Sequence, residues 1–209
     1  MTIEMLQNVK KYGVYALLLG GILITSCDDD DPEPENEVEV VTDVTLVFTN
    51  TADASDVVRA SAEDPDGEGV QELQIQDDIT LTSGATYTLT FEIFNNLETP
   101  GEDIGEEIEE EDDEHQFFFS FTDGAFSDPS GNGNRDNASD PINYEDEDSD
   151  GQDGTGNPVG LETTWTAGDA LTDGSFRVTL KHQPDVKTST SDVNDGDTDW
   201  DLTFVLNIE

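Results

Sequence analysis

The chain has 209 residues and a formal net charge of −44, from 51 acidic and 7 basic residues. This balance excludes nucleic acid as a default partner, because phosphate binding needs clustered lysine and arginine. It also argues against electrostatic docking onto anionic lipid. The charge alone is typical of disordered chains, but 33% of the residues are hydrophobic and gather in strand-like runs. The length fits one folded domain with an export segment and a linker.

The first 26 residues are similar to a bacterial lipoprotein signal peptide. Lys10 and Lys11 precede the apolar run Tyr12–Thr25, which is too short for a typical spanning helix. The sequence Ile-Thr-Ser before Cys27 resembles a lipobox, in which the cysteine thiol receives the lipid and becomes the new N-terminus. We therefore expect Cys27 to anchor the processed chain to a membrane. The alternative is a free thiol behind an uncleaved anchor.

The residues after Cys27 read DDDDPEPENEVE and predict an extended acidic tether over residues 27–43. Acidic residues at this place resemble the surface-export signal of Bacteroidota lipoproteins, which implies an outer-membrane, cell-surface location. In enterobacterial sorting an aspartate after the cysteine implies retention in the inner membrane instead. Because the chain has one cysteine, the exported domain has no internal disulfide and depends on its core or on bound metal.

Hydrophobic residues alternate with polar ones through residues 44–209, and clusters of Gly, Asp, Asn and Pro separate the runs. This pattern predicts an all-β domain, an antiparallel Ig-like β-sandwich of about eight strands. The predicted strands cover residues 44–49, 73–76, 79–82, 86–94, 117–121, 161–166, 176–182 and 200–208.

Two acidic segments depart from the strand pattern. Residues 102–114 carry Ile104 and Ile108 four apart, which predicts a short helix that packing or cations must stabilise against its like charges. Residues 122–160 are rich in Gly, Asn and Asp and predict a long acidic loop. A loop of this length in a small domain is usually functional or disordered.

The long loop contains a candidate calcium site. Its aspartates alternate and are followed by Gly151, which resembles the first half of an EF-hand loop, where alternate oxygens turn toward one point. Asn157 stands where an EF-hand has its bidentate glutamate, so we expect a helix-free Ca²⁺ loop or, equally, solvated acidic turns. The candidate Ca²⁺ ligands are Asp146, Asp148, Asp150 and Asp153, with Asp64 and Asp66 as a weaker second pair.

The only two histidines, His115 and His182, each lie at one end of a strand-like run. If these strands are neighbours, the pair is suited to a transition metal or haem. The alternative is that both are surface or structural histidines.

Motifs for catalysis are absent from the sequence: it has no cysteine nucleophile in the domain, no G-x-S-x-G elbow and no HExxH. Paired carboxylates of the kind used by glycoside hydrolases remain an alternative, since acids are so numerous. Four aromatic residues are either a stacking platform for sugar or part of the core: Trp165, Trp200, Tyr87 and Tyr144.

Several stretches together resemble a group of small flavobacterial surface lipoproteins of unknown function. They are the cysteine-acid leader, EDIGEEIEEEDDEHQFFF, GNPVGLETTWTAG, RVTLKHQPD and DTDWDLTFVLNIE. Members are often labelled type 1 periplasmic-binding-fold proteins, a fold of two doubly wound α/β domains, whereas the strand-turn-strand pattern here predicts an all-β domain. The resemblance implies a location and no particular activity.

The sequence therefore predicts a lipid-anchored, non-enzymatic surface module that binds a glycan or protein ligand, with acidic loops ordered by Ca²⁺. The first alternative is a metal or haem acquisition lipoprotein that uses His115 and His182. The second is a carboxylate-type enzyme acting on glycans.

Overall fold

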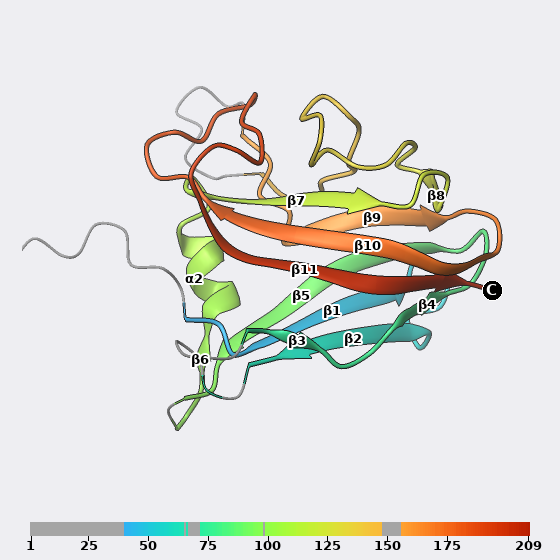
Figure 1. Cartoon of the computed structure of the whole chain (residues 1–209), viewed down its shortest axis with the longest axis horizontal. Coiled ribbons are helices and arrows are strands. Elements are labelled where there is room, and N and C mark those ends of the chain that lie inside the picture. Colours follow the sequence, from blue (N-terminus) through green and yellow to red (C-terminus); the bar gives the residue numbers. More distant parts are fainter. Residues whose placement is uncertain (1–39, 65, 67–71, 98, 148–155) are drawn as a thin grey trace, which may run out of the picture. The chain divides into compact units, whose positions relative to one another are not determined.

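The computed structural model describes residues 40–64, 66, 72–97, 99–147 and 156–209, which belong to one compact unit, Asn36–Glu209. Two β-sheets pack against each other, and the described residues contain one helix (Figure 1). The elements are β1 (Asp43–Asn50), β2 (Val57–Glu63), β3 (Gln74–Ile75), β4 (Ile79–Leu81), β5 (Thr86–Asn95), β6 (Glu102–Asp103), α2 (Ile104–Glu110), β7 (His115–Phe121), β8 (Phe126–Asp128), β9 (Glu162–Ala167), β10 (Leu171–His182) and β11 (Asp197–Ile208).

The first sheet has the strand order β3-β2-β1-β5-β9-β8, with β6 paired to β5, and the second has the order β4-β11-β10-β7. Strand pairs in both sheets are antiparallel, except that β4 runs parallel to β11. The predicted all-β, sandwich-like fold is therefore confirmed. The alternation of strands and helices that a doubly wound fold requires does not occur in the part of the chain that the structure describes.

Aromatic rings from both sheets fill the space between them. Trp165 on β9 is fully buried and contacts Phe119 on β7 and Phe176 on β10, with ring centroids 5.2 and 5.1 Å apart. Phe48 on β1 also reaches Phe176, at 5.7 Å. These edge-to-face contacts join strands that are far apart in the sequence, and they tie the two sheets together.

The outer edge of β7 is covered by the long predicted loop. The backbone N–H of Phe117 donates to Val159 O at 2.7 Å, and that of Phe121 donates to Asn132 O at 2.9 Å. Gly133 has a φ of 94°, and a Cβ there would collide with the carbonyl of Phe119, so the close approach requires glycine. The loop supplies hydrogen-bond partners for backbone groups of the edge strand β7, which would otherwise be unpaired.

Helix α2 closes one end of the sandwich, as Figure 1 shows. The side chain of Asp103 caps it by accepting a hydrogen bond from Gly105 N at 3.1 Å. Ile104 and Ile108 are both buried, so the predicted acidic helix and its apolar face are confirmed. The helix ends at Glu110, and a turn of four acidic residues leads directly into β7. This turn positions the candidate site.

Candidate metal centre

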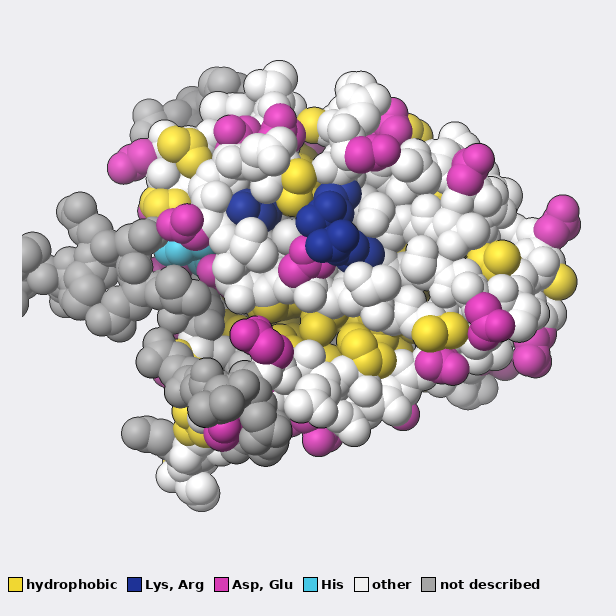
Figure 2. All heavy atoms as spheres, viewed as in Figure 1, with side chains coloured by type: hydrophobic (Ala, Val, Ile, Leu, Met, Phe, Trp, Pro, Cys, Tyr) yellow, Lys and Arg dark blue, Asp and Glu magenta, His cyan; other side chains and the backbone are white. Residues whose placement is uncertain are grey.

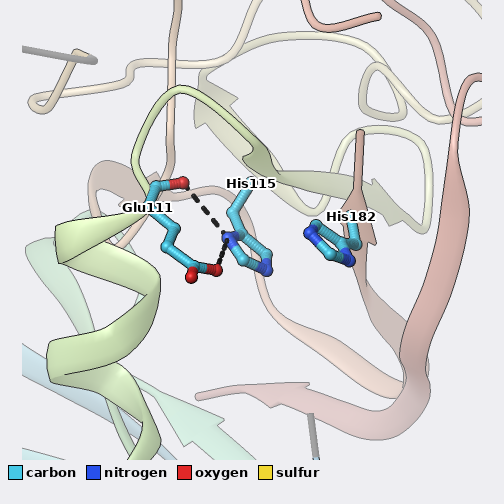
Figure 3. A group of neighbouring side chains, drawn as sticks. All are labelled: Glu111, His115 and His182. Carbon is cyan, nitrogen blue, oxygen red and sulfur yellow. Dashed lines mark hydrogen bonds and ion pairs between the residues drawn. The ribbon is translucent and has the colours of Figure 1, made fainter. Parts of the chain in front are cut away.

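The two histidines lie side by side at the end of the sandwich that α2 closes. His115 is the first residue of β7, His182 is the last residue of β10, and the register of the two strands pairs them directly. Their rings are parallel within 5° and their centroids are 4.6 Å apart (Figure 3). Both residues are buried, with exposed fractions of 0% and 4%. The neighbouring strands on which the metal hypothesis depended are therefore present.

Glu111, the residue that caps the C-terminus of α2, lies beside His115. Its carbonyl oxygen is 3.2 Å from His115 Nδ1, and its carboxylate Oε2 is 4.0 Å from the same nitrogen (Figure 3). One donor atom from each of Glu111, His115 and His182 lies within 4.8 Å of the other two. The Glu111 side chain is half exposed, so this group of donors is open to solvent on the glutamate side.

Glu114 forms a hydrogen bond with the second histidine, His182. Its Oε2 is 3.1 Å from His182 Nε2, and its backbone carbonyl accepts a hydrogen bond from Gln183 N at 2.6 Å. The two bonds fix the start of β7 to the end of β10. Figure 2 shows a small histidine surface that acidic side chains border, and of the two histidines only His182 has any exposed surface.

Asp199 approaches the two histidines from β11, and its side chain is buried. Its Oδ2 lies 3.8 Å from His115 Nε2, and neither this nitrogen nor either oxygen of Asp199 has a hydrogen-bond partner. A buried polar group without a partner costs about 1–3 kcal/mol, and more when charged. With its proton on Nδ1, His115 turns a lone pair on Nε2 toward this carboxylate, and a proton on Nε2 would remove the mismatch. Glu111, Glu114, His115, His182 and Asp199 are called the histidine cluster below.

Burial sets the charge states of His115 and Asp199. Desolvation lowers the pKa of His115 to about 4, against the opposing hydrogen bond to Glu111, so the imidazole is neutral at neutral pH. Desolvation likewise raises the pKa of Asp199 to about 6, which leaves its carboxylate mostly ionised at pH 7. A neutral imidazole and an ionised carboxylate are the forms that bind metal ions.

The donor set favours a borderline transition metal. Two imidazoles and a carboxylate are ligands that Zn²⁺ binds with bonds of about 2.0–2.2 Å. Other borderline divalent ions also accept imidazole. Ca²⁺ instead takes about 6–8 oxygen ligands. Three protein donors leave one tetrahedral position for water or another ligand.

The carboxylate of Asp146, a predicted Ca²⁺ ligand, binds backbone amides. It accepts hydrogen bonds from the N–H groups of Gly160, Leu161 and Glu162, with distances from 2.7 to 3.2 Å. These bonds connect Asp146, within the long loop of residues 122–160, to the residues at the end of that loop. Asp148, Asp150 and Asp153 lie outside the described residues, so calcium binding by this loop stays a prediction.

The weaker calcium pair forms a local turn. Asp64 is buried and its Oδ1 accepts a hydrogen bond from Asp66 N at 3.1 Å, whereas the side chain of Asp66 is exposed. Ca²⁺ binding at this pair also stays a prediction.

A cavity of about 400 Å³ lies between the helix α2 and the long loop of residues 122–160. Its walls include the acids Glu109, Asp146 and Glu162 and the apolar residues Val159 and Leu161. No aromatic residue lines it among the described residues. The four aromatic residues considered as a sugar platform pack against or within the core: Trp165, Trp200, Tyr87 and Tyr144. The described surface therefore offers no exposed stacking platform from these residues.

No protein-family model, curated protein or solved structure matched the chain. Among the described residues, no helix has the length and apolar character needed to cross a membrane. Cys27, the predicted signal peptide and most of the predicted tether lie outside the described residues.

Proposed function

We propose that this protein is a lipid-anchored surface lipoprotein that binds a divalent transition-metal ion through Glu111, His115 and His182. The observation that carries the proposal is the in-register pairing of the two histidines, with one donor atom from each of Glu111, His115 and His182 within 4.8 Å of the other two. Two imidazoles at adjacent strand ends, with carboxylates on either side, bring three donors so close that small side-chain rotations would direct them at one ion.

A metal ion fits this geometry better than haem does. In haem with two histidine ligands, the imidazoles approach the iron from opposite faces of the macrocycle. Here the rings stack with centroids 4.6 Å apart, and ordinary contacts between carbon atoms already need about 3.5–4.0 Å. A macrocycle therefore has no room between them, whereas an ion at the edge of the stacked pair needs none.

The leader supports an exported location for this ion-binding domain. Cys27 in a lipobox and the acidic run behind it are the features from which we infer a lipid-anchored protein on the outer membrane. In that setting the bound ion comes from outside the cell or from the periplasm. The domain is then a binding protein for the ion, and its open coordination position allows the ion to be exchanged.

The proposal is tested by titrating the purified full-length chain with Zn²⁺ in competition with a chromophoric chelator. The titration is done at physiological ionic strength and in excess Mg²⁺, because a chain of charge −44 collects cations without a defined site. We expect one tight site per chain. Glu111→Gln and His182→Gln should each weaken it by roughly tenfold or more.

Glu109→Gln is the matched control, since Glu109 is an exposed acid of the same helix and outside the donor group. This variant loses the same charge as Glu111→Gln and should keep the wild-type affinity. Equal loss of affinity in both variants, or the lack of a saturable site in the wild type, would contradict the proposal.

A further inference from the structure

The aspartate in the histidine cluster is buried because β11 contains a bulge. The register pairs Leu180 with Trp200 and Lys181 with Thr198, so Asp199 has no opposite residue on β10. In a regular strand Asp199 would point outward with Asp201, which bonds Arg177 on the outer face. The extra residue lets the side chains of Asp199 and Trp200 both turn inward, and such bulges often re-aim a side chain at a site.

In this position Asp199 faces the Nε2 nitrogen of His115. Asp199 Oδ2 lies 3.8 Å from Nε2 of His115, while Nδ1 of the same ring faces Glu111. A neutral imidazole has one N–H and one lone pair, and the partner of one nitrogen decides which nitrogen can bind a metal. A carboxylate accepts hydrogen bonds only, so Asp199 stabilises the proton on Nε2.

We propose that Asp199 is a positioning residue, which accepts the Nε2 proton of His115 once an ion binds and so favours the tautomer whose Nδ1 lone pair faces the metal ion beside Glu111. The inference rests on the proposed function. Without metal, Nδ1–H donates to the carbonyl of Glu111. When an ion binds, the Nδ1 proton leaves to solvent and a proton returns on Nε2, so the ring stays neutral. The new N–H then donates to Asp199. A carboxylate that orients a metal-binding histidine is a common arrangement in metalloproteins.

The tautomer is measured directly by ¹⁵N NMR on the full-length chain with labelled histidine and bound Zn²⁺. Because the chain has two histidines, the spectrum contains only four ring nitrogens, and His182→Gln assigns them. We expect His115 to carry its proton on Nε2 and the metal on Nδ1. A proton on Nδ1, with the metal on Nε2, would overturn the inference and make Asp199 a direct ligand.

Asp199→Asn supplies the second readout. We expect the Zn²⁺ affinity to fall roughly 10- to 100-fold, while the control variant Asp169→Asn, at an exposed acid on another part of the chain, binds like wild type. The metal-free Asp199→Asn protein should be at least as stable as wild type, since an unpartnered buried carboxylate has been removed. A purely structural role for Asp199 predicts the opposite, a less stable metal-free protein.

The outcomes separate the two claims. A wild-type chain that binds no Zn²⁺ overturns both the proposed function and this inference. A wild-type chain that binds Zn²⁺, combined with unchanged affinity in Asp199→Asn, overturns the inference alone. The NMR measurement needs no substitution at position 199, so it decides the matter even if that variant fails to fold.

Discussion

Replacing Asp146 by alanine should destabilise the domain through its backbone contacts. The carboxylate accepts hydrogen bonds from three consecutive amides, those of Gly160, Leu161 and Glu162. A hydrogen bond to a charged group contributes about 1.5–3 kcal/mol, but the site is only partly buried and water replaces part of each bond. Allowing about 1 kcal/mol for each amide, we expect Asp146→Ala to lose about 3 kcal/mol.

Asp146→Asn separates the hydrogen bonds from the charge. Burial raises the pKa of Asp146 even though the three amides oppose this, so a neutral group is tolerated here. The asparagine variant keeps one oxygen for the amides and should lose only about 1 kcal/mol. Asp169→Ala, at an exposed acid, is the control for removing one negative charge from the chain.

The assay is urea unfolding, followed by the fluorescence of the two buried tryptophans and repeated in EDTA and in millimolar Ca²⁺. For a domain of this size, 1 kcal/mol corresponds to a shift of about 2–4 °C in Tm, which gives a second readout. We expect the full loss in EDTA, because the amides need no ion. If Asp146→Ala is destabilised only when Ca²⁺ is present, the reasoning is wrong and the carboxylate acts through an ion.

Three further predictions concern other parts of the molecule. Burial would raise the pKa of Asp201, but its hydrogen bonds and charge interaction with Arg177 hold it below the usual 3.8. The resulting stability is present above pH 3.8 and is lost as the pH falls through the lower folded-state pKa. Asp201→Asn should therefore lose about 1 kcal/mol at neutral pH and nothing in strong acid, as measured by urea unfolding. Trp165→Ala should lose about 3–5 kcal/mol by opening a cavity in the core, measured by far-UV circular dichroism. Cys27→Ala should abolish the incorporation of labelled fatty acid into the chain, because no thiol is present at position 27 to receive the lipid. Each premise has its own contradicting result. These results are an Asp201→Asn protein as stable as wild type at neutral pH, a Trp165→Ala protein that loses under about 1 kcal/mol, and a Cys27→Ala protein that is labelled like wild type.

Much of the fold was predictable because most strands carry large alternating side chains. The predicted strand at residues 86–94 corresponds to β5, Thr86–Asn95, in which Tyr87, Leu89 and Ile93 are fully buried. β2, Val57–Glu63, was missed because its inward residues include Ala60 and Ala62. Alanine fills the core there without giving a hydrophobic alternation in the sequence.

The candidate site was predictable only in part. The sequence places His115 and His182 at strand ends, but the register that stacks them depends on which strands become neighbours. Glu111 was hidden in a run of acids, and only the turn after α2 distinguishes it from Glu109 or Glu110. The sequence pattern predicts the wrong orientation for Asp199, because Asp199 alternates with Asp197 and Asp201 as an outward-pointing residue would. A bulge depends on the pairing of two strands, so one strand's pattern does not predict it.

The charges around His115 are the reason that we expect the proposed ion to be a dication. Burial keeps His115 neutral and leaves Asp199 mostly ionised at neutral pH, and the carboxylate of Glu111 lies on the other side of the same ring. A divalent ion bound beside Glu111 would offset the charges of these two carboxylates, which lowers the cost of burying the side chain of Asp199. A monovalent ion would leave one negative charge uncompensated. An exposed carboxylate does not distinguish monovalent from divalent ions in this way, because water and salt already screen its charge. The many acids of the chain attract cations of every kind, whereas at the histidine cluster we expect the two imidazoles to favour a transition-metal ion and the carboxylates to favour a dication.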